Sequence, residues 1–248
     1  MKRDYSIDFI KFFALLLIIN SHADICYPQY KMLATGGAIG DSLFLFCSGF
    51  TLFLGGVKRF DNYYKRRINR IYPTVFAVIV VMICMDGGLD NISHILYMGA
   101  GRPFLNAIMC YYIILYIIRK YLMNKMPIVW LTLIVIVLIA YWFFPYKMET
   151  GEKGIYGTSS LFRWIPYFGM MLMGALVGVK REKIECCLYS DTIKLFLCIV
   201  LFYGIQMVAH KVDIIAPLQI ISIPFLMGIC FYAYKVCRAK IFMEIYNS

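Results

Sequence analysis

Residues 127–144 read PIVWLTLIVIVLIAYWFF, a run without a charged side chain that decides the fold class. A helix needs about 20 mostly apolar residues to cross a bilayer, so this run predicts a membrane span. Seven further runs of the same kind lie near 9–26, 38–57, 71–86, 104–118, 161–179, 192–209 and 214–234. We therefore predict an all-α polytopic membrane helix bundle of about eight transmembrane helices, which forms one domain over residues 1–248.

The composition of the whole chain agrees with this prediction. Of its 248 residues, 62% are apolar and 16% are charged, whereas a soluble domain is usually about 45–50% apolar and about 25% charged. Such an excess cannot be hidden inside one soluble core, which excludes a soluble domain, a disordered chain and a secreted disulfide scaffold. The nine cysteines are scattered, mostly in apolar runs, and we interpret them as small core side chains without a metal or redox role.

The distribution of basic residues sets the expected orientation. The chain has 25 Lys and Arg against 14 Asp and Glu, a net charge of +11. With the N-terminus inside and the spans alternating, nineteen basic residues fall on the inner side and six on the outer side, a strong positive-inside pattern. We therefore predict cytoplasmic termini and contact with membrane lipids, and no nucleic-acid partner. The longest predicted outer loops, 87–103 and 145–160, could contact a partner on that side.

Ionisable side chains in the first predicted span are candidates for function, because charge at membrane depth is costly. His22 follows Lys11 by eleven residues, which puts both on one helix face about 16 Å apart along the axis. Asp8 is three residues from Lys11, close enough to pair with it. An imidazole can exchange a proton near neutral pH. The alternatives are that Lys11 extends to the cytoplasmic interface and that His22 is an interfacial or core histidine.

A second group of candidates is the basic cluster before the third predicted span, KRRINRIYP at 65–73. Arg67 and Arg70 are i,i+3 neighbours. At a helix N-terminus, their guanidinium groups and the free backbone N–H groups would form a phosphate site. The alternative is a positive flank that contacts anionic lipid headgroups. Pro73 fits either interpretation, because proline is tolerated in a first helical turn.

The segment GGAIGDS at 36–42 opens the second predicted span on the side of His22. Because the loop between the first two spans is short, we expect them to be antiparallel neighbours. Asp41 or Ser42 could then approach His22 and fix its tautomer. The alternative role of Asp41 and Ser42 is to cap the second helix. We interpret Gly49 as a site of close helix packing.

These patterns together resemble the integral-membrane acyltransferase family 3. DxxKx10H at 8–22 resembles the first-span signature of the family, which has Arg or Lys at the position of Lys11. GxSLFxxxSGF at 40–50 is similar to its second-span motif, and RxxRIxP at 67–73 to its third-span motif. This resemblance covers about the first 75 residues, and a looser one, which includes PYFGMxxxG at 166–174, continues to about residue 180.

The resemblance implies an enzyme of the bacterial inner membrane that moves an acyl group, usually acetyl, from cytoplasmic acyl-CoA to a hydroxyl of a carbohydrate or lipid-linked glycan. Acyl-CoA is the donor substrate, and no metal is expected. Carried onto this chain, His22 would be the catalytic histidine, and the donor would be bound by Lys11, Arg67 and Arg70. The family often has Asp at the position of Ser42. Here the acid stands one place earlier, and we take Asp41 as the candidate catalytic partner of His22.

Two other functions are open from the residues alone. A small transporter or flippase could use Asp8, Lys11 and His22 as a proton or substrate path. The family also commonly has about ten spans and a longer chain, whereas about eight spans are predicted here, so the last spans of the family are expected to be missing. A chain without them could be a non-catalytic family member.

Overall fold

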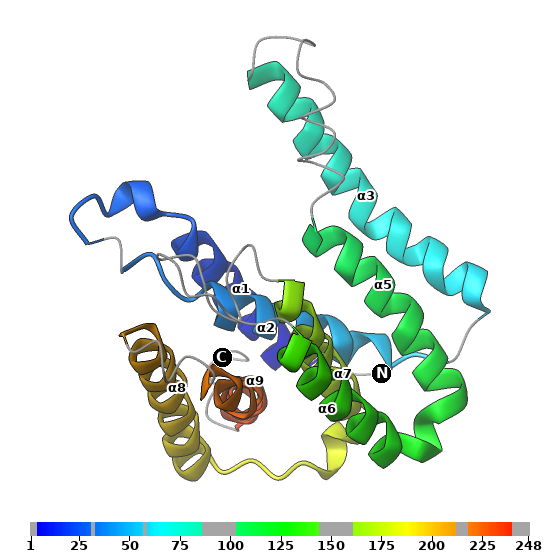
Figure 1. Cartoon of the computed structure of the whole chain (residues 1–248). Helices are drawn as coiled ribbons and strands as arrows, with labels where there is room; N and C mark the ends of the chain where they lie inside the picture. The colour runs from blue at the N-terminus through cyan, green and yellow to red at the C-terminus, as the bar shows by residue number, and fades with distance from the viewer. Residues whose placement is uncertain are drawn as a thin grey trace. The chain divides into compact units, whose positions relative to one another are not determined.

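The computed structural model describes residues 4–30, 33–56, 59–85, 103–143, 161–211 and 218–239. In this part of the chain each of the eight predicted spans overlaps an α-helix, which confirms the all-α prediction (Figure 1). These helices are α1 (Tyr5–Ser21), α2 (Gly37–Leu52), α3 (Phe60–Met85), α5 (Pro103–Ile117), α6 (Met126–Phe143), α7 (Trp164–Lys180), α8 (Leu188–Lys211) and α9 (Ser222–Arg238). The predicted outer loops lie outside the described residues, apart from residue 103.

The helices are those of a membrane protein. Among the described residues, three helical segments are long and apolar enough to span a bilayer: Phe104–Trp142, Leu188–Ala209 and Leu218–Arg238. The first segment holds α5 and α6, which a π turn at Ile118–Leu122 and a 3-10 turn at Met123–Lys125 separate. Large apolar side chains on the outer faces, such as Phe196 and Trp142, are exposed, as expected for contact with lipid. The count of eight spans stays a prediction.

The chain forms two compact units. The first unit comprises Met1–Gly55 and Thr132–Ser248, and within it α1, α2, α7, α8 and α9 pack in a bundle. The second unit comprises Gly56–Leu131 and contains α3 and α5.

Close contacts fix the relative direction of α1, α2 and α7. Gly37 at the start of α2 lies against Ser21 at the end of α1, while the Cys47 thiol donates to the Ile7 carbonyl at 3.8 Å, so α1 and α2 are antiparallel as predicted. Gly174 of α7 packs directly on the backbone of Phe46 in α2, and Gly178 packs on the backbone of Phe50. Because both contacts advance along the two helices in the same direction, α2 and α7 are parallel neighbours.

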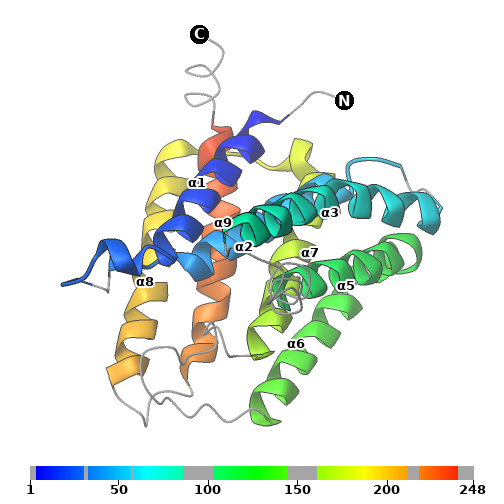
Figure 2. The ribbon, with the colours of Figure 1, turned by 90° about the horizontal axis from the view of Figure 1, so that it is seen from above.

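The helices α8 and α9 lie side by side and run in opposite directions (Figure 2). The Gln206 amide donates to the Ser222 hydroxyl at 2.9 Å near one end. Asp191 and Lys235 meet at the other end. The helix directions in this unit agree with the alternation of spans expected from the charge pattern. The cytoplasmic placement of the termini stays a prediction.

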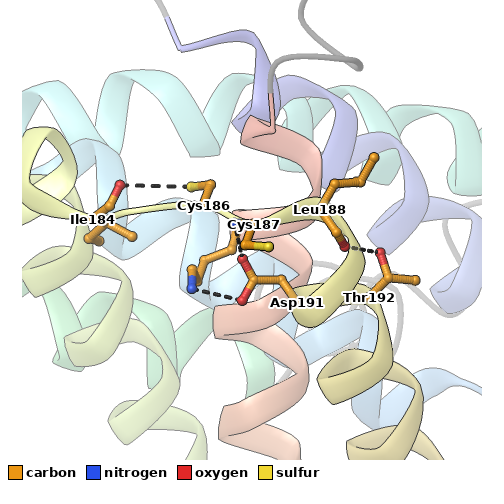
Figure 3. Close-up of polar contacts among 7 residues, drawn as sticks. Ile184, Cys186, Cys187, Leu188, Asp191 and Thr192 are labelled. Carbon is orange, nitrogen blue, oxygen red and sulfur yellow. Dashed lines mark hydrogen bonds and ion pairs between the residues drawn. The ribbon is translucent and has the colours of Figure 1, made fainter.

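A buried ion pair fixes the start of α8 against α9 (Figure 3). Asp191 is 1% exposed, and one carboxylate oxygen accepts from Lys235 Nζ at 2.7 Å. The other oxygen accepts from the backbone N–H of Cys187 at 2.8 Å, and the Thr192 hydroxyl donates to the Leu188 carbonyl at 2.6 Å. Since a buried carboxylate is stable only when it is paired, this contact holds the two helices in one register.

Candidate functional site

His22 lies at the end of α1. The first predicted span continues to residue 26, but the helix ends at Ser21, and a 3-10 turn at Asp24–Cys26 follows. The backbone N–H of His22 donates to the Ile19 carbonyl at 3.1 Å. The prediction that His22 belongs to the same continuous helix as Lys11 is therefore wrong by one residue. The side chain of His22 is exposed.

The loop after His22 is tied back to α1 through Asn20. The amide of Asn20 donates to the carbonyls of Leu33 and Thr35, at 2.8 Å and 3.0 Å. The hydroxyl of Tyr27 donates to the amide oxygen of Asn20 at 3.0 Å. These bonds hold the loop against the last turn of α1 and satisfy two loop carbonyls.

Asp41 lies in the second turn of α2, and neither it nor Ser42 caps the helix. The cap is Gly36, whose φ of 101° is a left-handed conformation that glycine adopts without strain. The capping alternative for Asp41 and Ser42 is therefore wrong. An added Cβ on Gly36 or Gly40 would also collide with α1, so these glycines bring the start of α2 close to the end of α1.

Asp41 joins a polar cluster that we call the α2–α7 cluster: His22, Asp41, Arg163, Trp164 and Tyr167. The buried Tyr167 hydroxyl donates to the Asp41 carboxylate at 3.5 Å. His22 and Arg163 both lie near enough to act electrostatically on that carboxylate. The Arg163 guanidinium stacks over the Trp164 ring at 4.5 Å, and Trp164 meets Tyr167 edge-on at 6.1 Å.

Of the two candidate partners of His22, the structure places Asp41 near it. Ser42 is fully buried, and its hydroxyl finds no hydrogen-bond partner among the described residues. A helix turns 100° per residue, so adjacent side chains point in different directions. A carboxylate beside an exposed imidazole can orient the ring and stabilise its charged form, which is the arrangement of a general base.

In the second unit, the basic cluster does not stand at a helix N-terminus. Its helix, α3, begins at Phe60, so Arg67 and Arg70 lie in later turns and Pro73 lies in the helix interior. The prediction that free backbone N–H groups complete a phosphate site here is therefore wrong, because those groups are bonded within the helix. What remains for anion binding is the pair of guanidinium groups.

Arg67 is held between two tyrosine rings, which we call the Arg67 cage. Its guanidinium carbon lies 5.5 Å from the ring centres of both Tyr63 on α3 and Tyr112 on α5. The Tyr63 hydroxyl donates to the Tyr112 carbonyl at 3.2 Å and so ties the two helices together. Burial raises the pKa of Tyr63 to about 12, so this donor keeps its proton at neutral pH. Cation–π contact with two rings limits where the guanidinium can lie.

The edge of that guanidinium is the part suited to a ligand. The Arg67 Nε is buried and has no hydrogen-bond partner in the described part of the chain. A guanidinium of fixed plane presents parallel N–H donors that match a phosphate. Arg70, one turn further along, is exposed. The arrangement can therefore bind an anionic group.

Lys11 lies in the middle part of α1 and belongs to the first unit, whereas Arg67 and Arg70 belong to the second. It is half-buried, and both Lys11 and Asp8 lie near enough to the buried Cys47 of α2 to act on it electrostatically. The predicted pairing of Asp8 with Lys11, and the role of Lys11 in donor binding, stay predictions.

Sequence reasoning missed Arg163 and Tyr167 as members of a site. Arg163 counted there only as one of the basic residues on the outer side, and Tyr167 only as part of the PYFGM segment. The glycines were the signal that could have found them. Gly174 and Gly178 of α7 are four residues apart, and α2 carries Gly49, which packs against α7. Small residues at a spacing of four predict close helix contact. That contact brings Tyr167 to Asp41.

Comparison with known proteins gives one match. The model of a family described as an acyltransferase domain matches residues 4–240, nearly the whole chain. No curated protein and no solved structure matches the chain.

Proposed function

Because the chain belongs to acyltransferase family 3, we propose that it transfers an acyl group, in the simplest case acetyl, from acyl-CoA to a hydroxyl of a carbohydrate or lipid-linked glycan. The observation that carries the proposal is the α2–α7 cluster, in which an exposed histidine stands near the carboxylate of Asp41. A base of this kind is what a hydroxyl needs to become a nucleophile at neutral pH.

In the proposed reaction His22 takes the proton of the acceptor hydroxyl while the hydroxyl oxygen attacks the thioester carbonyl. The carbon–sulfur bond then breaks, and the CoA sulfur leaves as a thiolate that receives the proton from His22. A second route uses the same residue. The imidazole nitrogen attacks the thioester carbonyl and displaces the CoA thiolate, which leaves an acyl-histidine. The acceptor oxygen then attacks the acyl carbon, the carbon–nitrogen bond breaks, and the hydroxyl proton passes to the CoA thiolate. In both routes Asp41 holds the imidazole tautomer and stabilises the imidazolium.

We assign the donor phosphates to Arg67 and Arg70. The support for this assignment is the Arg67 cage, which fixes one guanidinium and leaves its buried Nε without a partner among the described residues. A buried N–H donor without an acceptor costs free energy, and a phosphate oxygen would remove that cost. Lys11 is proposed as a further contact to the donor.

The proposed location is the bacterial inner membrane, with acyl-CoA supplied from the cytoplasm and the acceptor presented on the outer side. The charge distribution supports this placement. Arg67 and Arg70 fall on the side that the positive-inside rule assigns to the cytoplasm, and His22 falls on the opposite side.

The test is acyl transfer in isolated membranes. Membranes from cells with and without the gene are incubated with acetyl-CoA that carries a radioactive acetyl group, and the glycan fraction is counted after extraction. The proposal predicts base-labile label in the glycan only when the gene is present, because an O-acetyl ester is cleaved by mild base. Movement of glycan across the membrane without covalent label would favour a transporter instead.

A further inference from the structure

We infer that Arg163 is a positioning residue for the proposed reaction, which acts through Asp41 and so controls how well Asp41 supports His22. The inference rests on the proposed function. It concerns a residue outside the three motifs that carry the family resemblance, because those motifs end at residue 73 and Arg163 directly precedes α7.

The backbone position of Arg163 and a contact with a neighbouring ring together limit where its guanidinium can lie. The residue ends the 3-10 turn Leu161–Arg163, directly before Trp164 at the start of α7. Its guanidinium stacks over the Trp164 ring at 4.5 Å, which limits where the charge can lie. The Arg163 Nε is buried and makes no hydrogen bond to any described residue, so a hydrogen bond of that atom does not explain why an arginine is present.

Geometry places Arg163 near the Asp41 carboxylate. Arg163 precedes Tyr167 by one helical turn, and the Tyr167 hydroxyl donates to Asp41 at 3.5 Å, which is a long and therefore weak hydrogen bond. Arg163 and His22 both lie near enough to act electrostatically on the same carboxylate. Because the proposed reaction starts from a neutral His22, we assign the compensation of this half-buried carboxylate to Arg163.

Loss of the Arg163 charge is expected to affect the chemical step and not the binding of the donor. Without the charge of Arg163, the half-buried Asp41 carboxylate would lose a compensating charge and would then support the imidazolium of His22 less well. The step that forms the imidazolium would slow down. We expect donor binding to stay unchanged, because the donor phosphates are assigned to Arg67 and Arg70 and not to Arg163.

The test is a double-mutant cycle on acetyl transfer in membranes. Arg163→Gln is expected to lower kcat about tenfold, with the KM for acetyl-CoA unchanged, and Arg163→Lys is expected to keep most of the rate. In the Asp41→Asn background, Arg163→Gln should cause almost no further loss, because the carboxylate through which it acts is gone. Lys183→Gln, at the other end of α7 and exposed, is the matched control and should leave both constants unchanged.

Two results would overturn the inference while leaving the proposed function intact. One is a loss from Arg163→Gln that is equally large with and without the Asp41 carboxylate. The other is a changed KM for acetyl-CoA with unchanged kcat. If Arg163→Gln elutes as an aggregate in size-exclusion chromatography, Arg163→Lys takes its place in the cycle. It is then compared with the unaltered Arg163 both with Asp41 and with Asp41→Asn. No transfer by the unaltered chain would overturn the proposed function, and this inference with it.

Discussion

The guanidinium of Arg67 lies over the rings of Tyr63 and Tyr112, and the hydrogen bond from the Tyr63 hydroxyl to the Tyr112 carbonyl ties these two residues together. A guanidinium that is already oriented loses little entropy when it binds a phosphate, so it contributes more to affinity than an equally charged flexible side chain. Arg70, which is exposed, has no such restraint described.

This difference predicts unequal effects on donor affinity. Arg67→Ala should raise the KM for acetyl-CoA about tenfold, the typical effect of losing one charge-assisted hydrogen bond, and Arg70→Ala should raise it less. Lys65→Ala, on the exposed side of the same helix, is the control. The measurement is initial rate against acetyl-CoA concentration. Equal KM values in all three variants would contradict the assignment of the donor phosphates to Arg67 and Arg70. The basic cluster would then set the topology or contact lipid headgroups only.

At the same scale, the sequence predicted individual residues only where the chemistry is local. The spacing of Arg67 and Arg70 on one helix holds, because i,i+3 neighbours follow from helix geometry alone. Arg163 and Tyr167 could not be assigned from spacing, since they reach Asp41 across 122 and 126 residues of sequence (163 − 41 and 167 − 41). That contact depends on which helices pack together.

At the scale of the helix, the apolar runs predicted the helix positions well and two helix ends badly. α1 stops five residues before its apolar run does, and at this end Asn20 bonds the loop at Leu33 and Thr35. α3 begins eleven residues before its run, because its first turns are polar and hydropathy identifies the membrane-embedded part of a helix only. Both errors come from interactions that an apolar run does not report.

The crossing of α2 and α7 is the element contact on which the proposed site depends. Gly174→Ala should destabilise the protein by about 1–3 kcal/mol, because the added methyl group would meet the backbone of Phe46 and force the helices apart. The separation would also move Tyr167 away from Asp41 and lower the rate of transfer. The measurement is the Tm of the detergent-purified protein.

Gly204→Ala in α8 is the matched control, because a Cβ at that position meets no atom of another helix within 4 Å in the part of the chain that the structure describes. It should leave the Tm unchanged or raise it slightly, since alanine favours a helix more than glycine does. A Tm of Gly174→Ala equal to that of Gly204→Ala would contradict the close crossing of α2 and α7.

At the scale of the whole molecule, the directions of the helices bear on where the proposed reaction takes place. The directions of the helices within each unit agree with alternating spans, from the antiparallel pair α1 and α2 to the antiparallel pair α3 and α5, where Phe60 meets Tyr116 and Arg67 meets Tyr112. Charge asymmetry in the sequence could predict this alternation because it acts on every loop. The sequence could not divide the chain into its two units, because that division follows from tertiary contacts.

The central claim is that His22 carries acyl transfer to a glycan. The most direct measurement is mass spectrometry of the cell-surface glycan from three strains: one with the gene, one without it, and one with His22→Ala expressed at the same level in the membrane. The account predicts the mass increment of an acyl group in the first strain and its absence in the other two, since loss of the base should cost at least about a hundredfold in rate. The same acylated glycan in the His22→Ala strain would contradict it.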